Sequence, residues 1–389
     1  MKNSNFHQET KAIHAADGAD KDSRPLSTPI FQTATFEVKA IEEQLKAAAT
    51  DSFYTRYGNP NFTACETTLA ALELAEAALV FSSGMAAITN SVLAVVQAGD
   101  HVIAQSDLYG TTYKFFTQWL PRYGIEITFI ETNNLDEVKK ALRPNTKLLY
   151  LETPTNPILK LVDLKAMAAW AKTKSIITIV DNTFNSPINL QPLPLGIDVV
   201  VHSATKYLCG HADLVCGAVA SSADFIRKIY GVRSTLGSIM DAHAAWLLLR
   251  GMRSLPIRIE RVNQNALRIA EFLQHHKSIK KVYYPFLASH PQYELAMTQM
   301  KGGGGIVTFE IKGSEEQACK IVNSLKLFAI APSLGGLESL VTMPALTTHF
   351  EISKEERMRI GVSDQLIRLA IGIENVEDLI ADLEQALNK

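Results

Sequence analysis

A lysine and an aspartate follow two apolar segments of this 389-residue chain. Lys206 comes shortly after the apolar run at 198–201, and Asp181 directly follows the run at 176–180. Both runs have the composition of buried strands, and ligands bind beyond the carboxyl ends of the strands in an open parallel sheet. We therefore expect both side chains to face one crevice, where a poorly solvated lysine amine could form an imine with an aldehyde.

An amine and an acid in one crevice suggest pyridoxal phosphate as the cofactor. The Lys206 amine would form an imine with the cofactor aldehyde. The Asp181 carboxylate would keep the pyridine nitrogen protonated, so that the ring can accept electrons. These are the two protein groups on which the chemistry of that cofactor depends.

The phosphate of such a cofactor needs donors of its own. One set is the hydroxyl groups of Ser203 and Thr205, which flank Lys206 in the sequence. A second set is a helix that we expect to begin near Gly84, after Ser83, and to end at Gly99. The free N–H groups in the first turn of a helix can bind a dianion.

Each of these features has a more common explanation when taken alone. An aspartate at a strand end is usually a turn or capping residue, and most lysines are solvated surface charges. A phosphate loop, an aspartate and a lysine on successive strand ends are hard to explain separately. We therefore interpret them as parts of one site.

Three further residues could take part in the chemistry. Arg368 lies within the apolar segment 366–371, where a guanidinium needs a carboxylate, either from an internal ion pair or from a substrate. Tyr109 follows the apolar run at 102–104 and could stack on the cofactor ring or move protons, although an ordinary half-buried tyrosine has the same pattern. Arg56 is either a surface residue or an anion ligand supplied to a neighbouring subunit.

The elements that must position these residues alternate along the chain. Short apolar runs separated by helical segments predict an α/β doubly wound sheet. The predicted strands are 78–81, 102–104, 125–130, 148–151, 176–180, 199–201 and 216–220. After them, an amphipathic stretch at 241–276 is interrupted by Pro256, and a mixture of strands and helices follows.

We divide the chain accordingly into three parts. Residues 1–58 are predicted to be an N-terminal arm that contacts another subunit. Residues 59–254 are predicted to form a large cofactor-binding domain, and residues 255–389 a smaller α+β domain.

The composition excludes several classes of protein. There are 38 Lys and Arg residues against 40 Asp and Glu residues, a net charge of −2, so nothing favours nucleic acid or an anionic membrane as a partner. The four cysteines have no zinc-ligand spacing, and we expect no metal. The polar first residues lack the apolar core of a signal peptide, and no stretch is long enough to span a bilayer. We expect a cytoplasmic protein with a small-molecule substrate.

The motifs of the chain resemble those of the Cys/Met-metabolism family of pyridoxal phosphate enzymes, which is of fold type I. This group contains cystathionine γ-synthase, the cystathionine lyases and methionine γ-lyase, and the resemblance covers nearly the whole chain. The motifs that carry it are Tyr54-Thr55-Arg56, Ser82-Ser83-Gly84-Met85, Glu152-Thr153-Pro154-Thr155-Asn156-Pro157, Asp181-Asn182-Thr183, Ser203-Ala204-Thr205-Lys206-Tyr207 and Ser333-Leu334-Gly335-Gly336.

The resemblance implies a role for each matching residue. Lys206 would hold the cofactor covalently and move protons, Asp181 would pair with the pyridine nitrogen, and Tyr109 would stack on the ring and assist departure of the γ-substituent. Asn156 would lie near the phenolic oxygen of the cofactor, and Arg368 with Ser333 would bind the substrate carboxylate. The implied phosphate ligands are Ser83, Gly84, Met85, Ser203 and Thr205, joined by Tyr54 and Arg56 from a second subunit. The resemblance also implies a homotetramer built as a dimer of dimers.

The chain departs from the family at three positions that bear on substrate choice. Methionine γ-lyases commonly have a cysteine where this chain has Thr111. Cystathionine enzymes tend to have an arginine, which holds the distal carboxylate, where this chain has Lys114. They also favour an acid where this chain has Phe53.

We therefore expect elimination or replacement of the γ- or β-substituent of a sulfur amino acid or an activated homoserine. More specifically, we expect a cystathionine or methionine γ-lyase or an enzyme similar to cystathionine γ-synthase. Two alternatives remain from the sequence. One is a pyridoxal phosphate aminotransferase of fold type I, and the other is a binding or structural protein that has kept the fold.

Overall fold

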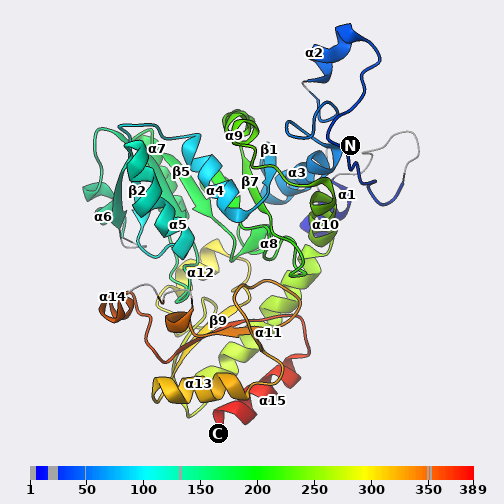
Figure 1. Ribbon diagram of the computed structural model, residues 1–389. Helices are drawn as coiled ribbons and strands as arrows, with labels where there is room; N and C mark the ends of the chain where they lie inside the picture. The colour runs from blue at the N-terminus through cyan, green and yellow to red at the C-terminus, as the bar shows by residue number, and fades with distance from the viewer. Residues whose placement is uncertain (1–5, 16–24, 49, 131–133, 348–349, 351–352) are drawn as a thin grey trace.

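The computed structural model describes residues 6–15, 25–48, 50–130, 134–347, 350 and 353–389. Two sheets, each with its own helices, form an upper and a lower lobe (Figure 1). Within these described ranges, no helix is both long enough and apolar enough to cross a membrane.

The upper lobe contains a seven-stranded sheet in the order β1-β7-β6-β5-β4-β2-β3. Strand β7 is antiparallel to both of its neighbours, and the other pairs are parallel. The mostly parallel sheet predicted from the sequence is therefore confirmed. The strands are β1 (Ala77–Phe81), β2 (His101–Gln105), β3 (Glu126–Ile130), β4 (Thr146–Glu152), β5 (Ile177–Asp181), β6 (Val199–His202) and β7 (Gly217–Ser221).

Helices cover both faces of this sheet, which is why its strands have nearly continuous apolar sequences. In β4, Leu148 and Tyr150 pack on one face, whereas Leu149 and Leu151 pack on the other. The first face is covered by α4 (Gly84–Leu93) and α9 (Ala223–Leu236), and the second by α3 (Pro60–Glu73) and α7 (Leu164–Thr173). The remaining helical segments of this lobe are α5 (Gly110–Lys114), η2 (Phe115–Trp119), η3 (Leu120–Tyr123), α6 (Leu135–Lys140), α8 (Ser186–Asn189) and η4 (Leu193–Leu195).

Helix α4 begins at Gly84 as predicted, but it ends at Leu93 and does not reach Gly99. The Val95 N–H bonds to the Val92 carbonyl in a tighter turn, which ends the α-helical pattern. Gly99 instead has a φ of +90° in the turn that leads into β2, a conformation that glycine adopts readily.

The lower lobe is joined to the upper one by two consecutive helices, α10 (Ala242–Arg253) and α11 (Leu255–His275). The break between them lies at Ser254, and Pro256 occupies the first turn of α11, where its missing N–H costs nothing. The predicted interruption of the stretch at Pro256 is therefore confirmed, with the break itself two residues before the proline. The break coincides with the predicted domain boundary at 254–255, which itself stays a prediction.

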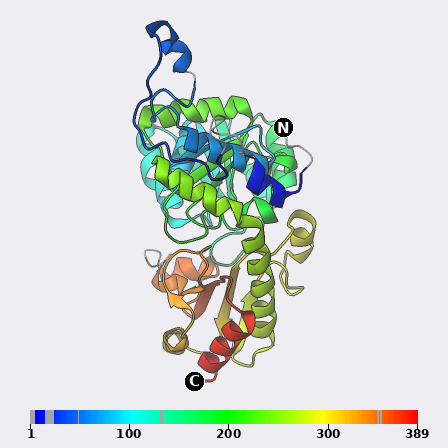
Figure 2. The same cartoon turned by 90° about the vertical axis from the view of Figure 1, so that its right-hand side faces the viewer.

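The small sheet has five strands in the order β10-β11-β12-β9-β8. In Figure 2, α11 runs along this lobe and ends near the C-terminal helix α15. The strands are β8 (Ile279–Tyr283), β9 (Ile306–Ile311), β10 (Ala329–Ile330), β11 (Leu340–Thr342) and β12 (Leu366–Ala370), and the helices are α12 (Tyr293–Gln299), α13 (Glu315–Ser324), η5 (Pro344–Leu346), α14 (Lys354–Arg359) and α15 (Val376–Leu387).

The N-terminal segment lies largely outside both lobes. It contains α1 (Gln8–His14), which packs against the upper lobe, and a projecting part with η1 (Ile41–Glu43) and α2 (Gln44–Ala47) (Figures 1 and 2). The N-terminal segment exposes large apolar side chains: Leu26 is 97% exposed, and Leu45, on the projecting part, is 88% exposed.

Candidate functional site

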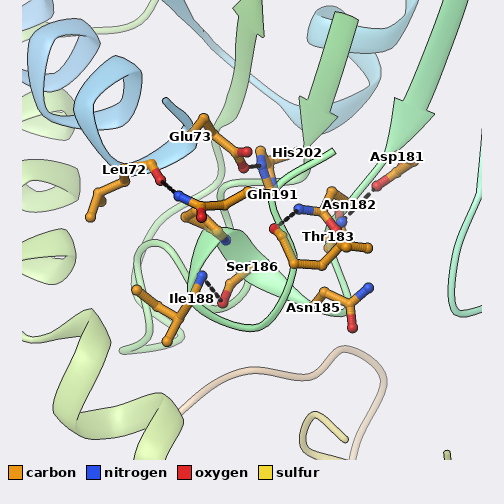
Figure 3. A network of polar contacts seen from close by, with 12 residues as sticks. Leu72, Glu73, Asp181, Asn182, Thr183, Asn185, Ser186, Ile188, Gln191 and His202 are labelled. Atoms are coloured by element: carbon orange, nitrogen blue, oxygen red, sulfur yellow. Dashed lines mark hydrogen bonds and ion pairs between the residues drawn. The ribbon is translucent and has the colours of Figure 1, made fainter. Parts of the chain in front are cut away.

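Two buried carboxylates lie side by side at the carboxyl edge of the large sheet. Asp181 ends β5, Glu152 ends β4, and the two residues are partners in the parallel register. The Thr183 N–H donates to Asp181 Oδ1 at 3.0 Å, which shapes the turn after the strand (Figure 3). Burial raises the pKa of Asp181, and hydrogen bonds from Thr183 partly oppose that rise.

The first turn of α4 lies directly against the end of β6. A Cβ atom on Gly84 would lie 2.8 Å from Ser203 Cβ, so only glycine allows this approach. The Ser83 hydroxyl accepts the Ala86 N–H at 3.1 Å, which leaves the N–H groups of Gly84 and Met85 at the open end of the helix. This corner can bind an anion through backbone donors.

The residues that follow β6 hold this anion-binding site in place through hydrogen bonds. The Ser203 N–H donates to the Thr183 hydroxyl at 2.8 Å. The Thr205 hydroxyl donates to the Cys216 carbonyl at 3.1 Å and accepts the Cys216 N–H at 2.9 Å. The five residues predicted as phosphate ligands in this chain therefore lie together: Ser83, Gly84, Met85, Ser203 and Thr205.

Lys206 contacts the lower lobe through its side chain. Its Nζ donates to the hydroxyl of Ser333, and the Ser333 carbonyl accepts from Arg368 Nη2 at 3.1 Å. Arg368 Nη1 also donates to Asn156 Oδ1 at 2.9 Å. Four of the predicted site residues, from both lobes, are thus joined in one hydrogen-bonded chain.

The environment of Lys206 favours a neutral amine. Burial is the main cause, and the nearby Arg368 charge adds to it, so the pKa of Lys206 falls from 10.5 to about 8. A nucleophilic lysine needs such an environment, because only the unprotonated amine attacks a carbonyl.

Arg368 is a buried cation whose observed contacts are neutral. Its side chain is 3% exposed, and burial lowers its pKa to about 10. Its Nε atom is buried without an acceptor, and in the described part of the chain its guanidinium bonds to an amide oxygen and a carbonyl but to no carboxylate. The internal ion pair considered from the sequence is therefore not found. A carboxylate from a ligand would suit this guanidinium.

Tyr109 is held by its backbone, so its ring remains free to contact a ligand. The Tyr109 N–H donates to Glu152 Oε2 at 2.9 Å, and the ion pair between Lys160 and Asp107, at 2.8 Å, fixes the same loop. The side chain of Tyr109 is 46% exposed.

A cavity of about 580 Å³ opens beside Tyr109 between the two lobes. The upper lobe contributes Thr111, Lys114 and Asn156 to its lining, and the lower lobe contributes Pro332 and Arg359. A substrate held by Arg368 and Asn156 would extend into this space.

Glu152 has a part in the site that its residue type alone did not reveal. Burial raises its pKa well above the usual value, and the neighbouring Asp181 adds to the rise, while hydrogen bonds from the Tyr109 and Asn156 backbones oppose it. Through these two hydrogen bonds, Glu152 connects the loop of Tyr109 to the loop of Asn156. The signal in the sequence was a second carboxylate at the end of the adjacent predicted strand.

Tyr54 and Arg56 stand apart from the residues above. Arg56 Nη1 donates to the Ser234 carbonyl at 2.6 Å, and its guanidinium lies 4.5 Å from the centroid of the Tyr57 ring. In the ranges that the structure describes, neither residue has a hydrogen bond or ion pair with Lys206 or Asp181.

The assembled groups fit a flat aldehyde cofactor with a phosphate and a basic ring nitrogen. They supply an amine of lowered pKa at Lys206 and a carboxylate at Asp181. They also supply an anion-binding site at the start of α4, which a side chain at position 84 would block. Among the described residues, no group of three or more His, Cys, Asp or Glu side chains could hold a metal ion.

Comparison with known proteins gives matches across the whole chain. The family described as "Cys/Met metabolism PLP-dependent enzyme" matches residues 9–388. The chain is 46% identical over 382 residues to cystathionine gamma-lyase of Bacillus subtilis, covering 98% of this chain and 99% of that protein. It is also 46% identical over 397 residues to L-methionine gamma-lyase of Fusobacterium nucleatum subsp. polymorphum, covering 100% of each. The crystal structure of metB from Corynebacterium glutamicum superimposes with a TM-score of 0.94 at 39% identity, covering 100% of this chain and 99% of that one.

Proposed function

Since the chain belongs to the family of Cys/Met metabolism PLP-dependent enzymes, we propose that it eliminates the γ-substituent of a thioether amino acid. Its relatives are carbon–sulfur lyases, so this chain is a pyridoxal phosphate enzyme that cleaves carbon–sulfur bonds. The aminotransferase considered from the sequence is not supported. The products would be a thiol, a 2-oxo acid and ammonia. The hydrogen-bonded chain from Lys206 to Arg368 supports this proposal, because it puts a proton carrier next to a carboxylate-binding guanidinium.

When bound, the cofactor supplies an electron sink that stabilises negative charge at the substrate Cα. Arg368 and Ser333 hold the substrate carboxylate, which orients the Cα–H bond toward Lys206. The Lys206 amine accepts that proton and moves protons between Cα and Cβ, so that the Cβ–H bond also breaks before the γ-substituent leaves; its lowered pKa favours these transfers near neutral pH. Tyr109 lies on the cavity side, where the γ-substituent departs, and donates a proton to the departing sulfur.

The cavity supports a substrate with a long distal part. Lys114 of α5, Arg359 of α14 and Asp107 are the charged residues of its lining, and a distal amino-acid group likewise carries charges. We propose that cystathionine, which carries a distal carboxylate, is preferred over methionine. A panel of cystathionine, methionine, homocysteine, cysteine and O-acylhomoserines tests this, with products identified by mass. Added thiols would reveal replacement, and a higher kcat/KM for methionine would contradict the preference.

The lowered pKa of Lys206 gives a pH-dependent prediction for cofactor attachment. The rate at which pyridoxal phosphate attaches to cofactor-free protein should rise about tenfold per pH unit below the pKa of about 8 and level off above it. Stopped-flow absorbance measures this rate. An ordinary lysine would instead give a rate that keeps rising to about pH 10. Because Arg368 contributes to the lowered pKa, the variant Arg368→Met should move the midpoint to higher pH.

The exposed arm supports a second copy of this chain as partner. We propose a homotetramer built as a dimer of dimers, in which Tyr54 and Arg56 of one subunit reach the phosphate of its neighbour. The apolar side chains exposed on the projecting part of the arm, such as Leu45, would be covered there. A cytoplasmic location is supported by four free cysteines, three of them buried.

A mixing experiment tests the contribution of Arg56 across the interface. Arg56→Ala and Lys206→Ala should each be nearly inactive. When the two are unfolded together and refolded, mixed dimers carry one intact site, and activity should recover to about a quarter of that of the unmodified enzyme. Refolding each variant alone is the control. Absence of recovery would place Arg56 in the site of its own chain.

A further inference from the structure

Arg258 is a buried cation that the reaction proposed above does not use. It lies in the first turn of α11, it is 6% exposed, and burial lowers its pKa to about 10. Among the residues that the structure describes, its hydrogen-bond acceptors are all neutral. A buried charge without a carboxylate is costly, so the groups to which it bonds indicate its role.

All three nitrogen atoms of this guanidinium donate hydrogen bonds. Nε donates to the Ser254 hydroxyl at 3.1 Å, Nη1 to the Tyr207 carbonyl at 2.9 Å, and Nη2 to the Gly251 carbonyl at 2.8 Å. Gly251 is in the last turn of α10, and Ser254 is the residue at which α10 and α11 are separated. Tyr207 directly follows Lys206. A planar group with fixed donor directions therefore connects the helix break to the loop of Lys206.

The turn that begins at Lys206 packs closely on this guanidinium. The Gly210 N–H donates to the Lys206 carbonyl at 2.8 Å, which closes the turn. A Cβ atom on Gly210 would lie 2.0 Å from Arg258 Nη1, so only glycine leaves the guanidinium on its three acceptors. The loop of Ser333 approaches the same turn, since a Cβ atom on Gly335 would lie 2.9 Å from the carbonyl carbon of Lys206. The main chain at Lys206 is therefore closely confined.

The position of this main chain determines where the Lys206 amine lies. The amine has to reach the cofactor aldehyde, and it has to face the Cα–H bond of a substrate that Arg368 holds. It donates to the Ser333 hydroxyl of the lower lobe, whereas its main chain belongs to the upper lobe. Helices α10 and α11 join the two lobes, so a group that fixes their break to the lysine loop preserves these distances.

We propose that Arg258 is a positioning residue for Lys206, which it holds in register with the lower lobe by fixing the lysine loop to the break between α10 and α11. It acts through the Tyr207 carbonyl and touches neither cofactor nor substrate. Burial and the charge of Arg368 account for the lowered pKa of Lys206. Loss of Arg258 should therefore change rates without changing the pH at which the amine titrates. The inference rests on the role of Lys206 proposed above.

The variant Arg258→Met tests this role, because methionine fills much of the same space and donates no hydrogen bond. The readout is the rate at which pyridoxal phosphate attaches to cofactor-free protein, measured against pH. The limiting rate at high pH should fall about tenfold to a hundredfold, because small displacements of reacting groups have effects of that size. The midpoint should stay near pH 8, whereas Arg368→Met moves it. In the holoenzyme kcat should fall by a similar factor with KM little changed, because Arg368 still binds the substrate.

Two milder variants separate the directed hydrogen bonds from the charge. Arg258→Lys keeps a cation but loses the planar set of three donors, so its limiting rate should lie between those of Arg258→Met and the unmodified enzyme. Ser254→Ala removes only the acceptor of Nε, and it should lower the limiting rate about two- to fivefold. Both variants keep the volume of the site nearly unchanged, so they also serve if Arg258→Met does not fold.

Asn265→Leu is the matched control on the same helix. Asn265 is buried about two turns beyond Arg258, and it also donates to backbone carbonyls, those of Gly372 at 3.1 Å and Glu374 at 2.9 Å. This control should lower the melting temperature and leave both the limiting rate and kcat unchanged.

Two results would overturn the proposal. One is an unchanged limiting rate in folded Arg258→Met, and the other is an unchanged limiting rate in both Arg258→Lys and Ser254→Ala. Absence of covalent cofactor at Lys206 in the unmodified enzyme would instead contradict the cofactor site itself, whatever the Arg258 variants do.

Discussion

Replacing Lys206 by alanine is expected to lower kcat by on the order of 10⁴-fold or more. The change removes the covalent attachment point of the cofactor and also the amine that moves protons at the substrate, and acid–base catalysis alone contributes up to about 10⁴-fold. Kinetics with cystathionine and methionine, under saturating pyridoxal phosphate, would measure the loss.

Labelling identifies the lysine independently of turnover. Borohydride reduction of the unmodified enzyme, followed by peptide mapping, should place the cofactor on the peptide that contains Lys206. Lys139→Ala is a suitable control, because Lys139 lies on the exposed surface of α6, where it pairs with Asp136. Full activity in Lys206→Ala, or a label on another peptide, would show that the assignment is wrong.

Replacing Arg368 by methionine is expected to lower kcat/KM by about 10²- to 10³-fold, because a buried charge pair with the substrate carboxylate is lost. The free protein should keep its fold and its melting temperature within a few degrees. Its guanidinium is buried among neutral partners, so a long apolar side chain also relieves a desolvation cost. Steady-state kinetics and thermal denaturation together measure the two effects.

The conservative variant Arg368→Lys separates charge from shape. It keeps a cation but loses the planar guanidinium that binds a carboxylate through two parallel hydrogen bonds. Its kcat/KM should therefore lie between the value of the unmodified enzyme and that of Arg368→Met. Cofactor absorbance should be retained in both variants. If Arg368→Met lowered kcat/KM no more than a surface change such as Arg268→Met, the guanidinium would have only a structural role.

The parts of the fold that follow local rules were predictable from the sequence. The strands of the large sheet are covered on both faces, so each appears as a short apolar run, and each prediction lies within two residues of the observed strand. Asp181 and the anion corner at Gly84 could be placed for the same reason, because they follow directly from strand ends.

Contacts between distant segments could not be predicted by such rules. The chain from Lys206 through Ser333 and Arg368 to Asn156 crosses both lobes, and 212 positions separate Arg368 from Asn156. Arg258 and Tyr207 are 51 positions apart, and nothing in either local sequence indicates the other. The end of α4 was misjudged because a tight turn, and not the glycine at 99, determines it.

The hydrogen bonds of Lys206 and Arg368 to Ser333 span the two lobes. The amine that we assign to proton transfer comes from the upper lobe, and the guanidinium that we assign to the substrate carboxylate comes from the lower one. Any rotation of one lobe against the other therefore changes the separation of these two groups, so that the lobe arrangement itself becomes a determinant of turnover.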